Sequence, residues 1–132
     1  MWIEYADDFK GICLHFNSRF EIEPIYPYVV TYCDPLPKYN FFEEKENILV
    51  KTISTKYKPK YSHEEEVRLF HFGRIKNIHF DCSLLISVII GEHLLEKNID
   101  KLRELLKRSD LQHVELKKAS LINHEEVTIE NI

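Results

Sequence analysis

Residues 61–72 have the sequence YSHEEEVRLFHF, in which charged side chains are crowded onto a segment with the composition of a buried strand. The valine, leucine and phenylalanine residues favour an extended chain, and side chains of a strand alternate between its two faces. Glu64, Glu66 and Arg68 are therefore predicted to share one face, with the apolar residues on the other. Because an unpaired charge in a low-dielectric interior costs several kcal/mol, we expect the charged face to line a cleft.

Two interpretations of this charged face are open. In the first, it is a preorganised carboxylate site, where Arg68 orients one carboxylate or holds a substrate phosphate. In the second, it is a structural ion-pair cluster, where Arg68 bonds Glu66 and ties the strand to a neighbour. The residue pattern alone does not separate the two.

Two further groups extend the candidate site. Residues 56–60 are predicted to form a basic loop. Its lysines either meet a phosphate of a nucleotide ligand or are simply solvated; they are Lys56, Lys58 and Lys60, beside Tyr57 and Tyr61. Trp2, Tyr5 and Tyr32 are predicted to form an aromatic wall against a base or nicotinamide ring, and Trp2 is the main candidate among them. Aromatic residues at regular spacing belong more often to a core, so this second role competes with ordinary packing.

Outward from this stretch, the sequence predicts a single α+β domain over residues 1–132, built on a mainly antiparallel sheet. The spacing of apolar residues predicts an N-terminal helix over 1–10, a middle helix over about 40–54 and a C-terminal helix from Leu95 to Arg108. Strands are predicted at 12–16, 28–33, 61–72, 84–90, 113–117 and 126–129.

The predicted N-terminal helix has a consequence for partners. It carries Trp2 and Tyr5, large side chains that need a surface to cover them. Either they pack on the sheet, or a partner supplies that surface. The sequence therefore predicts a protein partner or a homodimer through this aromatic helix.

Composition argues against several other classes of partner. Lys and Arg total 18 and Asp and Glu total 22, a net charge of −4 without a basic stripe, so no nucleic-acid partner is expected. The longest apolar run, 84–90, is far shorter than the roughly 20 residues of a membrane span, so no membrane partner is expected. Residues 1–4 lack the basic start and apolar core of a signal peptide.

The cysteines and histidines indicate neither a disulfide framework nor a metal site. Cys13, Cys33 and Cys82 are far apart, odd in number and form no CxxC pair, so a cytoplasmic location is expected. His63 and His71 would lie roughly 26 Å apart on a straight strand, beyond the reach of one metal ion. No metal ligand is therefore predicted.

Several motifs resemble the bacterial family called domain of unknown function 2971. They are Met1-Trp2-x-x-Tyr5-Ala6, Gly11-Ile12-Cys13-Leu14-x-Phe16, Tyr32, Lys56 and Tyr61-x-x-Glu64-x-Glu66-x-Arg68. Tyr61 stands where the family usually has tryptophan, and Lys56 is displaced by one residue. The resemblance covers nearly the whole chain but only the C-terminal part of the family domain, whose "NDPxE" and "CFS" segments have no counterpart here.

The layout of that family is similar to the ADP-ribosyltransferase fold, which implies a catalytic pair. Glu66 would hydrogen-bond the nicotinamide ribose of NAD as substrate, and Glu64 would orient the acceptor, or the two roles would be exchanged. Arg68, Tyr61, Trp2 and Lys56 would then bind substrate. The implied function is an NAD-using enzyme in bacterial defence, toxin action or phage conflict. The alternative is a non-enzymatic protein-interaction module that keeps the fold without a complete catalytic site.

Overall fold

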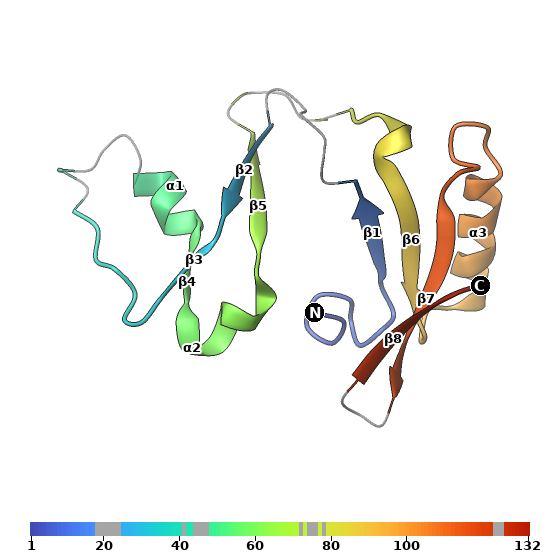
Figure 1. The fold of residues 1–132 in the computed structure, drawn as a ribbon, viewed down its shortest axis with the longest axis horizontal. Helices are drawn as coiled ribbons and strands as arrows, with labels where there is room; N and C mark the ends of the chain where they lie inside the picture. Colours follow the sequence, from blue (N-terminus) through green and yellow to red (C-terminus); the bar gives the residue numbers. More distant parts are fainter. Residues whose placement is uncertain are drawn as a thin grey trace. The chain divides into compact units, whose positions relative to one another are not determined.

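The structure is a computed structural model that describes residues 1–17, 25–40, 42–43, 48–71, 73, 77, 79–122 and 126–132 (Figure 1). Its contacts divide the chain into two compact units. Unit 1 comprises residues 1–20 and 77–132, and unit 2 comprises residues 21–76. We describe each unit by itself, and the prediction of a single domain over 1–132 stays a prediction.

Unit 1 is built on a four-stranded sheet with the order β1-β6-β7-β8 (Figure 1). The strands are β1 (Ile12–Phe16), β6 (Leu85–Gly91), β7 (Glu115–Ile122) and β8 (Glu126–Asn131). β6 pairs antiparallel with β1 and parallel with β7, and β7 pairs antiparallel with β8. The composition of β6, apolar apart from Ser87 and Gly91, suits its place inside the sheet, where both of its faces are covered.

Helix α3 (Glu96–Leu106) follows β6 and covers one face of this sheet. It connects the two parallel strands β6 and β7, the connection that parallel strands require. Its apolar stripe of Ile99, Leu102 and Leu106 packs against buried residues of the sheet and of the following loop, namely Leu85, Val88, Ile90 and Val114. A short 3-10 turn, η2 (Cys82–Leu84), leads into β6.

The other face of the sheet is covered by the N-terminal residues, which form turns and not the predicted helix. Asp7, Asp8 and Phe9 have φ angles of 47°, 53° and 60°, and three successive left-handed residues cannot continue a right-handed helix. The segment instead folds back so that Trp2 and Phe9 pack against Ile89 and Ala119. The prediction of an N-terminal helix over 1–10 is therefore wrong, and Trp2 belongs to a core.

Unit 2 contains short elements joined into two strand pairs. The strands are β2 (Ile25–Val29), β3 (Thr31–Cys33), β4 (Thr55–Tyr57) and β5 (Val67–His71). The helical elements are α1 (Ile48–Ile53), α2 (Lys58–Tyr61) and the 3-10 turn η1 (Ser62–Glu64). β2 pairs antiparallel with β5, and β3 pairs parallel with β4.

Of the predicted strand over 61–72, only Val67–His71 is strand; residue 72 lies outside the described residues. Pro59 occupies the first turn of α2, where a missing backbone N–H costs nothing, and so the predicted loop over 56–60 becomes the end of β4 and a helical turn. Glu65 then adopts a left-handed conformation, with φ of 47°, which ends η1. The predicted middle helix is also shorter, since only 48–53 is helical; residues 41 and 44–47 of that prediction lie outside the described residues.

The α+β class is confirmed, with strands outweighing helices, but the predicted arrangement of helices is wrong. The predicted helix after Leu95 is confirmed as α3. The strands predicted at 113–117 and 126–129 correspond to β7 and β8, which follow α3, so α3 is not a C-terminal helix. The sheet over residues 12–131 mixes parallel and antiparallel pairs because α3 crosses between parallel neighbours. Within the described parts of the chain, no helix is long and apolar enough to cross a membrane.

The two units differ in how much apolar surface they bury. Both clusters of buried apolar residues found among the described residues lie in unit 1. In the described part of unit 2, Val30 is the only apolar residue that is buried. Polar contacts therefore account for more of the organisation of unit 2.

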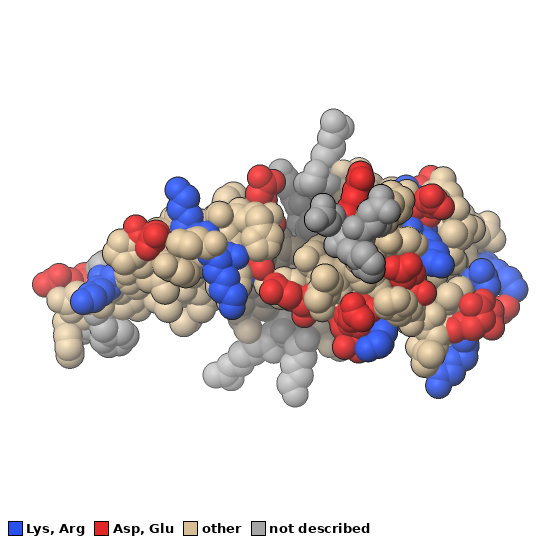
Figure 2. Space-filling model, turned by 90° about the horizontal axis from the view of Figure 1, so that it is seen from below, with Lys and Arg blue, Asp and Glu red and all other residues tan. Residues whose placement is uncertain are grey.

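Charges of both signs are distributed over the molecule. Figure 2 shows acidic and basic side chains interspersed on the face that it displays. By sequence, residues 21–76 contain nine Lys or Arg and nine Asp or Glu, so unit 2 has a formal charge of zero and unit 1 carries the net −4.

Candidate functional site

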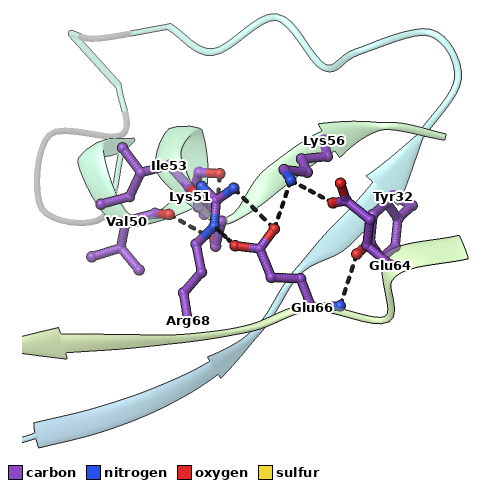
Figure 3. Close-up of polar contacts among 9 residues, drawn as sticks. Tyr32, Val50, Lys51, Ile53, Lys56, Glu64, Glu66 and Arg68 are labelled. Atoms are coloured by element: carbon purple, nitrogen blue, oxygen red, sulfur yellow. Dashed lines mark hydrogen bonds and ion pairs between the residues drawn. The ribbon is translucent and has the colours of Figure 1, made fainter. Parts of the chain in front are cut away.

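A four-residue ion-pair cluster, Lys56, Glu64, Glu66 and Arg68, is the candidate site of unit 2 (Figure 3). Lys56 on β4 is its centre. The Nζ atom of this lysine lies 2.5 Å from Glu64 Oε2 and 2.7 Å from Glu66 Oε2, so one ammonium group bridges two carboxylates. The side chains of Lys56 and Glu64 are only 16% and 11% exposed, which strengthens their attraction relative to a surface pair.

Arg68 holds Glu66 from the other side and connects the cluster to helix α1. Its Nε and Nη2 atoms donate to the two carboxylate oxygens of Glu66 at 2.6 and 3.2 Å, the two-bond geometry that guanidinium groups favour. Its Nη1 atom donates to the carbonyl oxygen of Ile53, the last residue of α1. Arg68 thereby caps a helix end and fixes a carboxylate at once.

The backbone around Glu66 is tied to β3 and to the residue between β2 and β3. The backbone N–H of Glu66 donates to the hydroxyl of Tyr32 at 2.9 Å (Figure 3). The carbonyl of Glu66 accepts from the N–H of Val30 at 2.9 Å. The left-handed Glu65 turns the chain between the two glutamates, so both side chains reach Lys56 although neither lies within a strand. The cluster therefore joins β3, β4, β5 and α1.

The electrostatic surroundings keep Glu66 ionised. Hydrogen bonds from Arg68 first, and from Lys56 second, lower the pKa of Glu66 from 4.5 to about 2. Such a carboxylate is charged throughout the physiological range, so it can accept a hydrogen bond or stabilise a positive charge. It cannot serve as a general acid near neutral pH, which requires a raised pKa.

Tyr61 belongs to the same neighbourhood. Its ring lies 4.8 Å from the Nζ atoms of both Lys56 and Lys60, within the range of cation–π contacts. The structure thus brings together five of the predicted site residues: Glu64, Glu66, Arg68, Tyr61 and Lys56.

Trp2 is the exception among the predicted site residues, because it lies in unit 1. It is 6% exposed and stacks on Phe9 with ring centroids 5.6 Å apart. A side chain that is so fully enclosed is a core residue, so its predicted role as a wall for a nicotinamide ring has no support. The related prediction of a partner bound through an aromatic helix is unsupported: the segment forms turns and Trp2 is buried, although Tyr5 is 63% exposed.

Sequence reasoning missed two members of this network. The hydroxyl of Tyr32 and the carbonyl of Ile53 hold the cluster in place, and they are 34 and 15 residues from their partners. A regularly spaced pattern does not signal such contacts. Tyr32 was a candidate only as an aromatic surface.

The chemistry that the cluster can support follows from its charge balance. Two cationic and two anionic side chains neutralise one another inside unit 2. In the part of the chain that the structure describes, no three His, Cys, Asp or Glu residues are grouped as a metal ion would require. Comparison with protein-family models, with curated proteins and with solved structures found no match. The resemblance to domain of unknown function 2971 therefore stays a proposal.

Proposed function

We propose that this chain is a non-enzymatic protein-interaction module. The observation that carries the proposal is a contrast within unit 2, where the ion-pair cluster is largely covered and apolar side chains of the β2–β5 pair are exposed. Glu64 and Lys56 are less than a fifth exposed, whereas Val29, Val67 and Leu69 on the β2–β5 pair are 76%, 53% and 53% exposed. Apolar side chains gathered on an exposed surface are typical of protein contact sites.

The ion-pair cluster supports this function as a scaffold. Because Lys56 and Arg68 already neutralise both carboxylates, the cluster resembles a structural ion-pair network more than a substrate-binding site. Its bonds hold β5 against β3, β4 and α1. This is the second of the two interpretations of the charged face, and it gives β5 a fixed position from which to present its apolar residues.

Site-specific photo-crosslinking tests the interaction proposal. A photoreactive phenylalanine analogue placed at Leu69, in cells that produce the chain, should give a covalent protein adduct. The matched control is the same analogue at Leu49, which is 67% exposed on α1 of the same unit. Adducts at 69 and not at 49 are expected; no adduct at 69, or equal adducts at both positions, would contradict the proposal.

An ADP-ribosyltransferase-like enzyme that uses NAD is the second candidate. Glu66 favours this candidate because it is ionised and Arg68 holds it in one orientation. A carboxylate that accepts a hydrogen bond from a ribose hydroxyl needs both properties. Glu64 would orient the acceptor, and Tyr61, Arg68 and Lys56 would contact the substrate. The resemblance to domain of unknown function 2971 suggests a bacterial role in defence, toxin action or phage conflict.

Calorimetric titration with NAD and with ADP-ribose separates the enzyme from the interaction module. The enzyme requires binding in the micromolar range, about −8 kcal/mol, that weakens in Glu66→Gln. The interaction module predicts no heat with either ligand. Binding that is lost in Glu66→Gln while the fold persists would favour the enzyme and overturn our first choice.

We also propose a cytoplasmic location. Cys13, Cys33 and Cys82 are all free thiols, which persist in reducing compartments. Thiol labelling of the chain inside intact cells should find all three reactive after denaturation, and any disulfide formed in the cell would count against this location.

A further inference from the structure

We infer that a second copy of this chain covers the apolar face of the β2–β5 pair, forming a symmetric homodimer. This inference rests on the proposed interaction function and names its partner. The apolar face is the set of side chains that project from one side of the pair. It contains the apolar Ile25, Pro27, Val29, Val67 and Leu69, and one polar residue, His71, at its end.

The register of the two strands defines this face. Val29 lies opposite Val67, Pro27 opposite Leu69 and Ile25 opposite His71. Directly opposed residues of an antiparallel pair share one face, so these three pairs form one continuous surface. Arg68 points to the other side, where it bonds Glu66 and α1. The face therefore contains no Asp, Glu, Lys or Arg.

The β2–β5 pair needs a contact on its apolar face because unit 2 buries few apolar side chains. An isolated two-stranded sheet is at best marginally stable in water unless an apolar face packs on something. Of the described residues of unit 2, only Val30 is a buried apolar side chain, and neither buried apolar cluster includes β2 or β5. The largest apolar exposure on the pair, at Val29, lies beside Val67 at one end of the proposed contact, and the exposed Leu69 lies at its centre.

Charge favours a second copy over a charged partner. A face without charged side chains meets its own image without repulsion, and the formal charge of unit 2 is zero. A strongly charged partner would instead have to leave its charges desolvated and unpaired against this surface. Two-fold symmetric contacts between identical patches are the commonest arrangement of homo-oligomers.

The size and charge of the contact set its expected strength. Six residues are far fewer than the roughly 20–30 per partner of a standard interface, so the dimer should be weak. The −4 charge of unit 1 adds repulsion between copies, which salt screens. Association should therefore increase, and not decrease, when salt is raised, unlike a contact held by ion pairs.

Sedimentation equilibrium of the whole chain is the test. The average mass should rise from 15.8 kDa toward twice that value as concentration approaches about 1 mM, and it should rise further at high salt. Leu69→Lys should return the average mass to that of the monomer. The matched control, Leu49→Lys, places the same change on an exposed leucine of α1 and should leave the association unchanged.

A milder variant distinguishes the loss of association from misfolding. Val67→Thr keeps a β-branched residue of almost the same shape at a position that is 53% exposed, so the strand should form. It should weaken association severalfold with an unchanged circular dichroism spectrum. A monomer at every concentration, or a dimer indifferent to both Val67→Thr and Leu69→Lys, overturns the inference.

The photo-crosslinking experiment distinguishes the two levels of the proposal. An adduct at position 69 with twice the chain mass supports the second copy. An adduct with a different protein overturns the second copy but leaves the interaction function standing. If there is no adduct at position 69 and the chain sediments as a monomer, both the homodimer and the interaction function are refuted. The face would then be in contact with solvent or with another part of the same chain.

Discussion

At the scale of single residues, Lys56 is the side chain on which the candidate site depends. Its ammonium group lies within 2.7 Å of two carboxylates that would otherwise repel one another. Partly covered charges interact more strongly than surface pairs, and removing one partner leaves the others poorly solvated. The residue therefore stabilises unit 2 whether or not a ligand ever binds there.

We expect Lys56→Met to lower the free energy of unfolding by about 1–3 kcal/mol, less than the loss of a fully buried partner because the cluster is partly exposed. Urea titration followed by circular dichroism measures this. Lys58→Met is the control, since Lys58 is an exposed lysine of the adjoining α2. Equal effects of the two substitutions would show that the ion pairs contribute nothing.

The lowered pKa of Glu66 predicts how stability depends on pH. The pKa of Glu66 is about 2 in the folded state, against 4.5 for the free group. The ionised carboxylate therefore contributes its full stabilisation above pH 4.5, and this contribution disappears as the pH falls toward 2. Solvent screening of this partly exposed carboxylate keeps the contribution well below the roughly 3 kcal/mol that the full shift represents. Wild type should thus be more stable than Glu66→Gln at pH 7, and the difference should close between pH 4.5 and 2. A constant difference in urea titrations across that range would refute the assignment.

At the scale of elements, the N-terminal segment and β6 meet at a glycine. The N–H of Gly91 donates to the carbonyl of Gly11 at 3.0 Å, and the N–H of His93 donates to the carbonyl of Phe9 at 3.0 Å. A Cβ atom on Gly91 would overlap the backbone of Phe9. Close backbone approach, and not an unusual φ angle, is what requires glycine here.

Gly91→Ala should therefore destabilise unit 1 by about 1–3 kcal/mol or more, because the backbone of Phe9 must move and carry Trp2 with it. Trp2 is the only tryptophan of the chain, so its fluorescence during denaturation reports on unit 1 alone. Gly73→Ala is the control, since the nearest described atoms to its added Cβ belong to the side chain of His71 in unit 2 and not to a backbone. An unchanged denaturation midpoint for Gly91→Ala would show that the close approach is not required.

At the scale of the whole molecule, the two units should differ in stability because they bury different amounts of apolar surface. Buried clusters on both faces of the β1-β6-β7-β8 sheet hold unit 1, whereas unit 2 depends on its polar cluster. Native-state hydrogen exchange at low protein concentration should show amides of β5 opening at least about 2 kcal/mol more easily than those of β6. Equal protection of β5 and β6 would mean that the chain unfolds as one cooperative unit.

The sequence by itself determined the parts of this protein that depend on local pattern. The apolar run near 84–90 predicted the inner strand β6, and the leucine stripe after Leu95 predicted α3. Both predictions succeeded because periodicity and composition act within one element. The crowding of Glu64, Glu66 and Arg68 likewise located the candidate site, although the strand assigned to it began too early.

Only the tertiary structure decided how these parts are used. Trp2 became a core residue through contacts with Phe9, Ile89 and Ala119. The carboxylates were neutralised by Lys56, and the apolar side of β5 was left exposed while its charged side was covered. These outcomes depend on contacts between residues that are far apart in the chain. The local spacing of apolar residues does not predict such contacts or their energies.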